Sequence, residues 1–431
     1  MSARIIIVGG GISGLVAALE LLEGDSLEVT LLEGSDQLGG LGASFQYEDL
    51  WIDKFYHCIM STDDYLLNLI EEVGLADELY WKQTGMGFIA SGVHYPFNTP
   101  RDLLKFRAIT LFDRFRLGLF SLLFRQLGKG EDLDNVRTET FLARYFGKEI
   151  WKRVLGPLFR SKFGDHAGDL PALYLWQRLG RERNVAKRGY LRCGLKGLID
   201  AIQISIQERG GTVRLNTPVK VIRDSESQME VILQNGEALY ADWVISTVPM
   251  PLFKLLTKGS SLEGKYKDPG SAVQGVVNAL FFLSRPLEGY YWIPVVDSNT
   301  TFDGIVEMSA LINQVQFGGR YVGYLVKYCD RNSEFFQKDD EHIIRKWTDE
   351  LLELYQHLPL RKQEILDVKI FKAPFVEPVY PLGYMAKKPD FQVDDSHLIL
   401  ANTAQVYPNI TCLNSSASLA QQAVNYLRAK L

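Results

Sequence analysis

Three glycines near the start of the chain have the spacing of a diphosphate-binding loop. Gly9, Gly11 and Gly14 form a Gly-x-Gly-x-x-Gly pattern. In such a loop the first glycine allows a tight turn, the second lets a diphosphate approach the backbone, and the third lets a helix pack closely. The N-terminus of that helix, with the N–H groups of Ile12 and Ser13, would face the diphosphate with a partial positive charge. The pattern predicts a nucleotide-diphosphate site.

Glu33 carries the second chemical signal. It ends an apolar segment, residues 27–32, that predicts a strand. A carboxylate here can accept hydrogen bonds from the hydroxyls of an adenosine ribose, and its charge argues against a 2′-phosphate. The elements that position both signals are a buried parallel strand at 5–8, a helix after the glycines, and the strand at 27–32. Together they predict a dinucleotide-binding fold.

A second glycine-rich loop follows Glu33 directly. Its expected cofactor contacts are Gly34, Ser35, Gly39, Gly40, Leu41, Ala43 and Ser44. With this loop the chain resembles the FAD-binding superfamily of amine oxidases, protoporphyrinogen oxidases, phytoene desaturases and UDP-galactopyranose mutases. In that superfamily the loop wraps the FAD diphosphate and ribityl chain. Leu41 departs from the pattern, because most oxidases have arginine there and the mutases often have asparagine, so backbone amides must supply more of the binding.

The resemblance also implies a domain organisation. It predicts an α/β fold with a Rossmann-like FAD-binding domain of the glutathione-reductase type, interleaved with a mixed-sheet and helical substrate domain. We expect the FAD-binding domain to comprise residues 1–84, 189–265 and 380–431. The substrate domain would comprise residues 85–188, with a helical region at 101–188, and residues 266–379.

The later returns of the chain to the FAD-binding domain supply further cofactor contacts by resemblance. Tyr56 and His57 would pass the isoalloxazine, Val219 would contact the adenine through its backbone, and Thr247 would end a strand beside the adenosine. An amide, Asn402, stands where the family commonly has an aspartate. The remaining expected contacts are Pro408, Asn409 and Ile410 in a turn, and Ser415 in the last helix, whose N-terminus would face the flavin.

Candidate catalytic residues are His57, Tyr384 and Tyr407, and Tyr380 is a further aromatic side chain that can wall a flavin cavity. Each has an alternative interpretation as a packing residue, and His57 can be a core histidine with satisfied hydrogen bonds. Flavin oxidations of activated C–H bonds need no strong protein base, so these residues are candidates by position alone.

Composition excludes several other classes of function. The chain has 431 residues and a net charge of −5, which gives nucleic-acid binding no support. Four scattered cysteines without a CxxC motif are typical of a reduced cytoplasmic protein. The six histidines lack metal-ligand spacing, so we expect no metal site. We expect neither a signal peptide nor a membrane-spanning helix, and the oligomeric state stays open.

Two basic stretches bear on the partners of the protein. Residues 101–127 mix leucine and phenylalanine with six arginines and lysines. They fit either peripheral contact with a membrane surface or two helices that pack on the substrate domain with their arginines turned outward. A second basic stretch, residues 178–192, can line a pocket for an anionic group. We therefore expect a small-molecule or lipid-linked substrate, with an anionic group as one option.

These features predict an FAD-dependent oxidoreductase, an oxidase, dehydrogenase or desaturase, that transfers hydride from a substrate C–H bond to flavin N5. One alternative is a flavoenzyme like UDP-galactopyranose mutase, which acts on a nucleotide-linked or lipid-linked sugar without net redox change. The segment around His57 and Tyr95-Pro96-Phe97-Asn98-Thr99 supports it, whereas the C-terminal mutase signature is absent after Leu400. A second alternative is an FAD-containing scaffold at a membrane surface.

Several local predictions can be compared directly with a structure. They are a helix over 63–80 capped by Asp63, a hairpin over 85–95 with Gly92 at its turn, a helix from Leu198 to Glu208, a strand over 370–379 interrupted at Pro374, and a last helix capped by Asn414 or Ser415.

Overall fold

A five-stranded parallel sheet contains strands from both ends of the chain. We describe a computed structural model that covers residues 2–24, 27–181, 186–225, 228–296, 298–358 and 360–431. The strands of this sheet, in spatial order, are β10 (Thr212–Arg214), β2 (Glu28–Leu32), β1 (Arg4–Val8), β14 (Trp243–Ser246) and β20 (Leu398–Leu400). The predicted strands at 5–8 and 27–32 are confirmed, and they pair in parallel.

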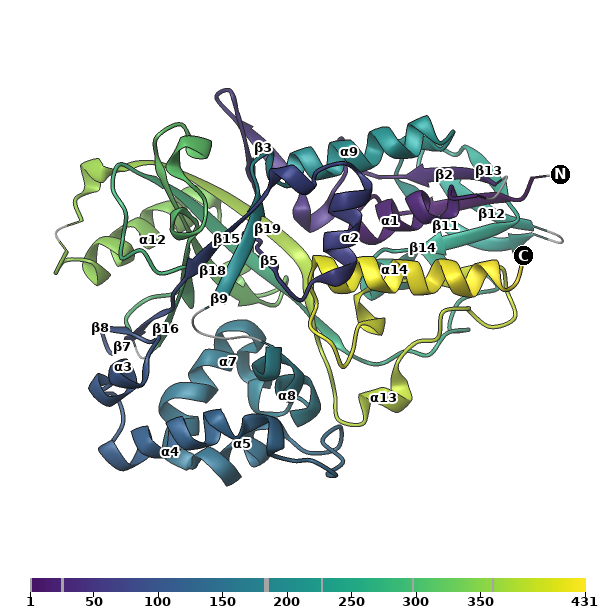
Figure 1. The fold of residues 1–431 in the computed structure, drawn as a ribbon. Coiled ribbons are helices and arrows are strands. Elements are labelled where there is room, and N and C mark those ends of the chain that lie inside the picture. Colours follow the sequence, from purple (N-terminus) through teal and green to yellow (C-terminus); the bar gives the residue numbers. More distant parts are fainter. Residues whose placement is uncertain (1, 25–26, 182–185, 226–227, 297, 359) are drawn as a thin grey trace.

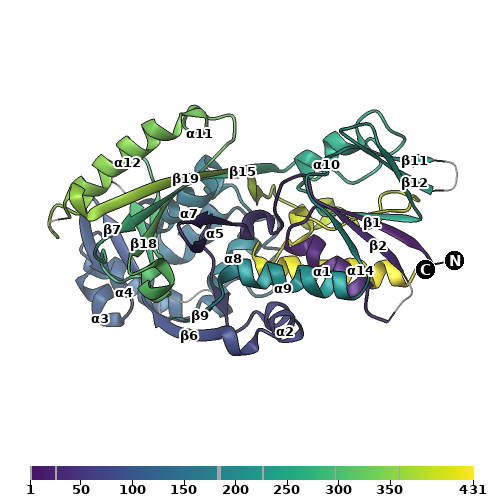
Figure 2. The same cartoon turned by 90° about the horizontal axis from the view of Figure 1, so that it is seen from above.

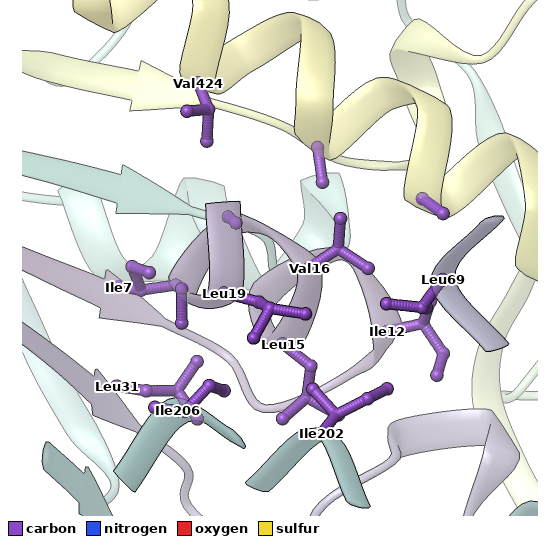
Figure 3. Packing of buried hydrophobic residues seen from close by; sticks show 14 of the residues in the cluster. Ile7, Ile12, Leu15, Val16, Leu19, Leu31, Leu69, Ile202, Ile206 and Val424 are labelled. Carbon is purple, nitrogen blue, oxygen red and sulfur yellow. The ribbon is translucent and has the colours of Figure 1, made fainter. Parts of the chain in front are cut away.

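Both faces of this sheet are covered, which explains why β1 is a continuous apolar run. Ile5 and Ile7 face the helices α1 (Ile12–Leu21), α9 (Gly194–Glu208) and α14 (Leu413–Arg428). Figure 3 shows Ile7 packed in this cluster beside side chains of α1 and α9. The alternate residues Ile6 and Val8 belong to a core on the other face. That face is covered by β11 (Val219–Ser225), β12 (Gln228–Leu233), β13 (Ala238–Ala241) and α10 (Met250–Thr257).

A seven-stranded mixed sheet forms the second large unit. Its spatial order is β19 (Ile365–Val379), β15 (Ala272–Leu283), β18 (Tyr321–Cys329), β17 (Gly304–Glu307), β16 (Trp292–Val296), β7 (Gly87–Ala90) and β8 (Val93–Pro96). Only β16 and β7 pair in parallel among the described strands of this sheet. Helix α12 (Asp340–Leu354) packs on one face through the buried Trp347. The predicted hairpin at 85–95, with Gly92 in its turn, is confirmed.

The predicted helical region is present, and it lies below the mixed sheet in Figure 1. It consists of α3 (Pro100–Lys105), α4 (Leu111–Leu122), α5 (Thr138–Phe146), α6 (Lys148–Ile150), a π-helical turn (Trp151–Leu155), α7 (Gly156–Phe163) and α8 (Ala172–Arg181). Its last predicted residues, 186–188, belong instead to strand β9 (Ala186–Leu191).

Smaller elements connect these units. The strands are β3 (Ser44–Tyr47), β4 (Leu50–Asp53), β5 (Ile59–Met60) and β6 (Leu79–Thr84). The α-helices are α2 (Asp64–Glu72), α11 (Glu334–Gln337) and α13 (Tyr384–Lys387). Short 3₁₀ helices are η1 (Gly40–Gly42), η2 (Ala76–Glu78), η3 (Phe124–Gln126), η5 (Gly164–Gly168), η6 (Met308–Ala310), η7 (Gln314–Phe317), η8 (Lys362–Glu364) and η9 (Thr403–Gln405). The predicted domain boundaries stay predictions.

The helix predicted over 63–80 is too long. Helix α2 ends at Glu72, and Gly74 then adopts a positive φ of 75°, which terminates the helix. The following residues enter β6, which pairs with β9. Asp63 stands at the N-cap of α2, but its carboxylate accepts a hydrogen bond from the Met60 N–H instead of the first turn of the helix.

Two helix boundaries and one strand interior also differ from the sequence-based expectations. Helix α9 begins at Gly194, four residues before Leu198. The N-cap of α14 is Cys412, and its N–H donates to the Ser415 hydroxyl in the first turn, as in a capping box. Pro374 does not interrupt β19. This strand lies at the edge of its sheet, where a residue without an N–H is tolerated, and Pro374 falls in an irregular register.

Candidate flavin site

The two glycine-rich loops lie against each other through their backbones. The Gly39 N–H donates to the Gly10 carbonyl at 2.8 Å. A Cβ on Gly40 would lie 3.3 Å from the Gly11 Cα, and one on Gly39 would lie 2.4 Å from the Ile199 side chain. The positive φ of Gly39, 110°, likewise favours glycine. A side chain at Gly40 would press on the first loop, and a side chain at Gly39 would clash with α9.

Gly11 and Gly14 differ in what surrounds them. A Cβ on Gly14 would lie 1.9 Å from the Gly9 carbonyl oxygen, so Gly14 lets α1 pack on the turn. A Cβ on Gly11 would meet nothing within 4 Å. Gly11 is the N-cap of α1, and no side chain caps the helix there. The first N–H groups of α1, which include those of Ile12 and Ser13, therefore have no side-chain cap from the N-cap residue.

Glu33 reaches back to the first loop. One carboxylate oxygen accepts a hydrogen bond from the Gly10 N–H at 2.7 Å, and the other accepts from the N–H and hydroxyl of Ser35, both at 2.8 Å. The first of these oxygens keeps a lone pair, because a carboxylate oxygen accepts about two hydrogen bonds. The carboxylate is thus held beside the glycine loop with capacity for one more donor.

The segment before β11 runs along Glu33 and its neighbours. The Thr217 N–H donates to the Glu33 carbonyl at 2.8 Å, and a Cβ on Gly34 would touch Pro218 at 3.5 Å. Val219 begins β11 directly after this contact. The structure therefore brings together the segments that contain Gly34 and Val219, two residues predicted to contact the cofactor.

Ser44 is hydrogen-bonded to a buried carboxylate, that of Asp53, which the sequence analysis did not predict as a site residue. Its hydroxyl donates to Asp53 at 3.0 Å, the Tyr190 hydroxyl donates to the other Asp53 oxygen, and Tyr324 donates to the Asp53 carbonyl at 2.8 Å. Burial raises the pKa of Asp53 to about 6, and the hydrogen bonds from Tyr190 and Ser44 oppose this shift. The only local signal was an acidic residue at the end of an apolar strand.

The other two residues predicted in this loop, Leu41 and Ala43, lie in and just after η1. Ala43 is buried, and its carbonyl accepts a hydrogen bond from the Lys54 N–H at 3.0 Å. Leu41 is half-buried. Its side chain has no hydrogen-bonding group, so it cannot supply the charged contact expected at this position.

Tyr56 and His57 lie where the chain crosses to the mixed sheet. The hydroxyls of Tyr56 and Tyr328 are 3.2 Å apart. The His57 Nδ1–H donates to the Phe55 carbonyl at 2.9 Å, which leaves Nε2 as the unprotonated nitrogen. Burial lowers the pKa of His57 to about 4, so the ring is neutral near pH 7. A neutral imidazole can accept a hydrogen bond but carries no charge.

Thr247 and Asn402 link the C-terminal ends of β1, β14 and β20. The Thr247 hydroxyl donates to the Val8 and Gly9 carbonyls, both at 3.1 Å. The buried Asn402 amide donates to the Val248 carbonyl at 3.0 Å and accepts from the Ala404 N–H at 3.0 Å. An aspartate could not donate to Val248. The amide therefore has a structural reason to replace the family's acid.

The last predicted segment leads into α14. The Tyr407–Pro408 bond is cis, and the Asn409 N–H donates to the Val406 carbonyl at 3.0 Å. The Ser415 hydroxyl donates to the Ile410 carbonyl at 2.6 Å. These bonds fix the entry of the chain into the helix.

The predicted catalytic tyrosines lie in a buried aromatic cluster. Tyr384 and Tyr407 pack with Tyr380 and Tyr174, with ring centroids 4.7–6.4 Å apart. The Tyr384 hydroxyl donates to the Ala404 carbonyl at 2.8 Å, and the Tyr407 hydroxyl donates to the buried Asp134. This arrangement favours the packing interpretation of both residues, and their catalytic role stays a prediction.

A buried ion pair lies beside this cluster, and the sequence analysis did not predict it. The Lys162 ammonium lies 2.9 Å from Glu377, whose side chain is 2% exposed. Tyr174 donates to the other Glu377 oxygen. Lys162 also lies over the ring of Tyr328, which contacts Tyr56. The ion pair therefore lies between the two groups of aromatic residues that were expected near the flavin.

Two other predicted features have local structural roles. The Asn98 side chain of the mutase-like segment accepts a hydrogen bond from the Met86 N–H at 2.6 Å, and Phe97 packs on Phe88 and Phe106. In the stretch 178–192, the Arg188 guanidinium donates to Thr84, and Arg192 donates to the Asp77 carbonyl. Residues 182–185 lie outside the described residues, so the predicted anionic pocket stays a prediction.

Comparison with known proteins identifies the class. The family model described as flavin containing amine oxidoreductase matches residues 12–377, and the chain belongs to this family. The chain is 23% identical over 403 residues to a 15-cis-phytoene desaturase from Solanum lycopersicum, covering 86% of this chain and 68% of that protein. It is 23% identical over 293 residues to the coproporphyrinogen III oxidase of Staphylococcus aureus, covering 59% and 62%.

Solved structures share the fold. A candidate protoporphyrinogen oxidase from Exiguobacterium sp. 255-15 superposes with a TM-score of 0.78 at 20% identity, with complete coverage of both chains. A reduced UDP-galactopyranose mutase gives a TM-score of 0.75 at 15% identity, covering 100% of this chain and 96% of the other. At these identities the likeness concerns the fold alone.

The chain is an FAD-dependent oxidoreductase with a mixed α/β fold. Its own residues fit the cofactor, because the paired glycine loops leave open space at Gly11 in front of the uncapped α1 N-terminus. Within the described residues, no cluster of three or more His, Cys, Asp or Glu side chains can hold a metal ion. No described helix has the length and apolar character needed to cross a bilayer.

Proposed function

We propose that this protein oxidises a C–H bond of a small-molecule or lipid-linked substrate. The chemistry that FAD supplies when bound is acceptance of a hydride at its N5 position. The observation that carries the proposal is the convergence of both glycine loops on the α1 N-terminus, within a chain of the flavin-containing amine oxidoreductase family. The sequence of residues 1–431 contains no second dinucleotide-binding motif for NAD(P)H. We therefore expect the reduced flavin to pass its electrons to oxygen, a quinone or a protein.

The binding side of the site would be a Rossmann-like domain of the glutathione-reductase type. The β1–α1–β2 order and the parallel sheet support this assignment. Gly11 would let the diphosphate approach the backbone, and the first N–H groups of α1, those of Ile12 and Ser13, would hold it. Glu33 would accept from the ribose, and Val219 would lie at the adenine.

The reacting side would be shaped by α14 and by the crossing segment. Helix α14 has sixteen residues, and its N-terminus carries a partial positive charge that stabilises negative charge nearby. Because the His57 imidazole is neutral, it would orient a donor through Nε2 without adding charge. The Lys162–Glu377 pair would hold a proton in a site from which most water is excluded.

The relatives' names indicate two candidate classes of substrate. One is a polyene such as phytoene, and the other is a reduced tetrapyrrole such as coproporphyrinogen. Amines remain a third class through the family description. All three classes give up hydride from an activated C–H bond.

The test begins with purified protein as isolated. Denaturation should release FAD, identified by chromatography against FMN. Anaerobic additions of amines, polyenes, prenyl lipids, porphyrinogens and nucleotide sugars should then bleach the bound flavin for one class alone. Protein that contains no flavin and takes none up would overturn the proposal, and so would a flavin that no electron-rich substrate reduces.

A mutase-like function is the second candidate, supported by the fold of the reduced UDP-galactopyranose mutase. The same experiment separates the two. A mutase would isomerise a nucleotide-linked or lipid-linked sugar only after prior reduction of the flavin, and it would consume no reducing equivalents. A flavin that is retained but inert to substrates of both kinds would instead support a scaffold.

A further inference from the structure

Large apolar side chains are exposed together on α3, α4 and the residue that follows α4. Among the described residues, eighteen large hydrophobic side chains are exposed, and seven of them lie between residues 104 and 123. They are Leu104, Leu111, Phe112, Phe115, Leu119, Leu122 and Leu123. Figures 1 and 2 both show α3 and α4 at the end of the molecule away from the parallel sheet. A cluster of this kind marks an interaction site.

The exposed residues of α4 form one face, here called the α4 face: Leu111, Phe112, Phe115, Leu119 and Leu122. At about 100° per residue, these positions fall within an arc of about 100°. The exposed fractions of Phe112, Phe115 and Leu122 are 73%, 63% and 87%. Leu117, on the opposite side, is buried and packs in the helical core. If the two helices only packed on the substrate domain, we expected their arginines to point to solvent. On α4, leucine and phenylalanine side chains point to solvent as well.

Arginines border the α4 face on both sides. By the same helical geometry, Arg114 and Arg116 stand at its two edges. Arg114 donates to the Ile109 and Leu104 carbonyls, and Arg116 donates to the Tyr145 and Arg144 carbonyls. Carbonyl partners fix the guanidinium groups but leave their charge uncompensated. Basic residues at the edges of an apolar helix face are typical of helices that lie in a membrane interface.

The surrounding segment is strongly basic although the protein is acidic. Residues 101–129 contain seven Lys and Arg and two Asp, a net charge of +5, against −5 for the whole chain. Asp102 and Asp113 are both bound at helix N-termini, where they accept hydrogen bonds from Thr99 and Thr110. Arg101, Lys105 and Arg107 are exposed. The exposed positive charge of this segment is therefore available to a partner that binds the α4 face.

We propose that the α4 face inserts into the interfacial layer of an anionic phospholipid bilayer. The apolar arc would enter the headgroup and acyl boundary, and the bordering cations would bind lipid phosphates. Pairing of two copies through this face would bring two segments of charge +5 together, so charge complementarity favours the anionic surface. The proposal goes beyond the oxidoreductase function and does not depend on turnover.

The test is flotation of the flavin-loaded protein with vesicles. Wild-type protein should float with vesicles of phosphatidylcholine and phosphatidylglycerol, and much less with phosphatidylcholine alone. The double variant Phe112→Asp with Phe115→Asp should reduce the partition coefficient at least about tenfold, because two exposed apolar anchors are lost. Arg101→Gln and Arg107→Gln should each reduce it about fivefold at low salt. The matched control is Val315→Asp, which places a charge at a 75% exposed apolar residue outside this segment and should float like wild type.

Three outcomes would overturn the proposal. One is absence of flotation with the anionic vesicles. Another is equal loss of flotation in the Val315 control. The third is a dimer, measured by light scattering without lipid, that the Phe112 and Phe115 substitutions dissociate, because it would assign the α4 face to a second copy of the chain. Flavin content and anaerobic bleaching are measured on the same samples, so failure of the oxidoreductase proposal remains distinguishable.

Discussion

The Ser13 hydroxyl donates a hydrogen bond to the Ser416 carbonyl at 3.3 Å, although the residues are 403 positions apart. Ser13 lies in the first turn of α1, and Ser416 lies in the first turn of α14. The N-termini of the two helices therefore meet at the glycine loops. Because each N-terminus carries partial positive charge, their convergence favours an anionic group at this point.

Gly11→Val should weaken cofactor binding without unfolding the protein. A valine Cβ meets no protein atom within 4 Å, and Gly11 has an ordinary φ of −73°. The side chain would instead fill the open space in front of α1. We expect the FAD affinity to fall at least about tenfold, or about 1.4 kcal/mol. Flavin-binding titration checks the affinity, and thermal unfolding of flavin-free protein should give an unchanged Tm.

Gly14→Ala is the matched control for that substitution. Its Cβ would lie 1.9 Å from the Gly9 carbonyl oxygen, so α1 must shift on the turn. We expect the flavin-free protein to lose about 1–3 kcal/mol of unfolding free energy. Equal effects of the two substitutions on flavin-free stability would contradict the distinct roles assigned to these glycines.

His57→Ala tests the catalytic candidate that the sequence predicts beside the flavin. The pKa of His57 is lowered to about 4, so the wild-type ring stays neutral above pH 5 and contributes no activity step near pH 6.5. Loss of the imidazole should change the visible spectrum of the bound flavin or reduce kcat strongly. His57→Gln, which keeps a hydrogen-bond acceptor, should recover part of either effect. An unchanged spectrum together with an unchanged rate would remove His57 from the site.

The nucleotide loop could be predicted from the sequence because its determinants are local. The β1–α1–β2 segment has its glycines, its apolar run and Glu33 within thirty-three residues, and periodicity identifies each element. The structure confirms the strands and the helix at these places. Helix ends were less predictable, since Gly74 ends α2 through a positive φ that periodicity alone does not indicate.

The buried polar groups could not be predicted because their partners are distant in sequence. Asp53 binds Tyr190, which lies 137 residues away, and Tyr174 binds Glu377, which lies 203 residues away. Nothing near Asp53 in the sequence indicates these partners. Pro374 gives a similar case, because the edge position that lets β19 continue through it is a property of the whole sheet.

Asp53 should make stability depend on pH in a defined window. Its pKa is about 6 in the folded protein and near 3.8 ordinarily, so between these pH values the folded state holds a proton that the unfolded chain has lost. The free energy of unfolding therefore falls as pH rises through this window, by up to about 3 kcal/mol. Urea unfolding of wild type and Asp53→Asn should show their difference shifting in favour of the variant from pH 4 to 6 and levelling above pH 7. A difference that does not vary with pH would contradict the raised pKa.

Tyr407→Phe separates packing from catalysis at the aromatic cluster. The Tyr407 hydroxyl is the partner of the buried Asp134, whose other oxygen accepts from the Met385 N–H at 3.1 Å, so its loss leaves one carboxylate oxygen unsatisfied. We expect unfolding to become easier by about 1–3 kcal/mol, with kcat of the flavin-loaded enzyme changed less than about threefold. Tyr384→Phe should cost about 1 kcal/mol, since its hydroxyl bonds the Ala404 carbonyl and Ser271, both neutral partners. If either substitution instead reduces flavin reduction a hundredfold at unchanged stability, that hydroxyl acts on the substrate, and the packing interpretation is wrong.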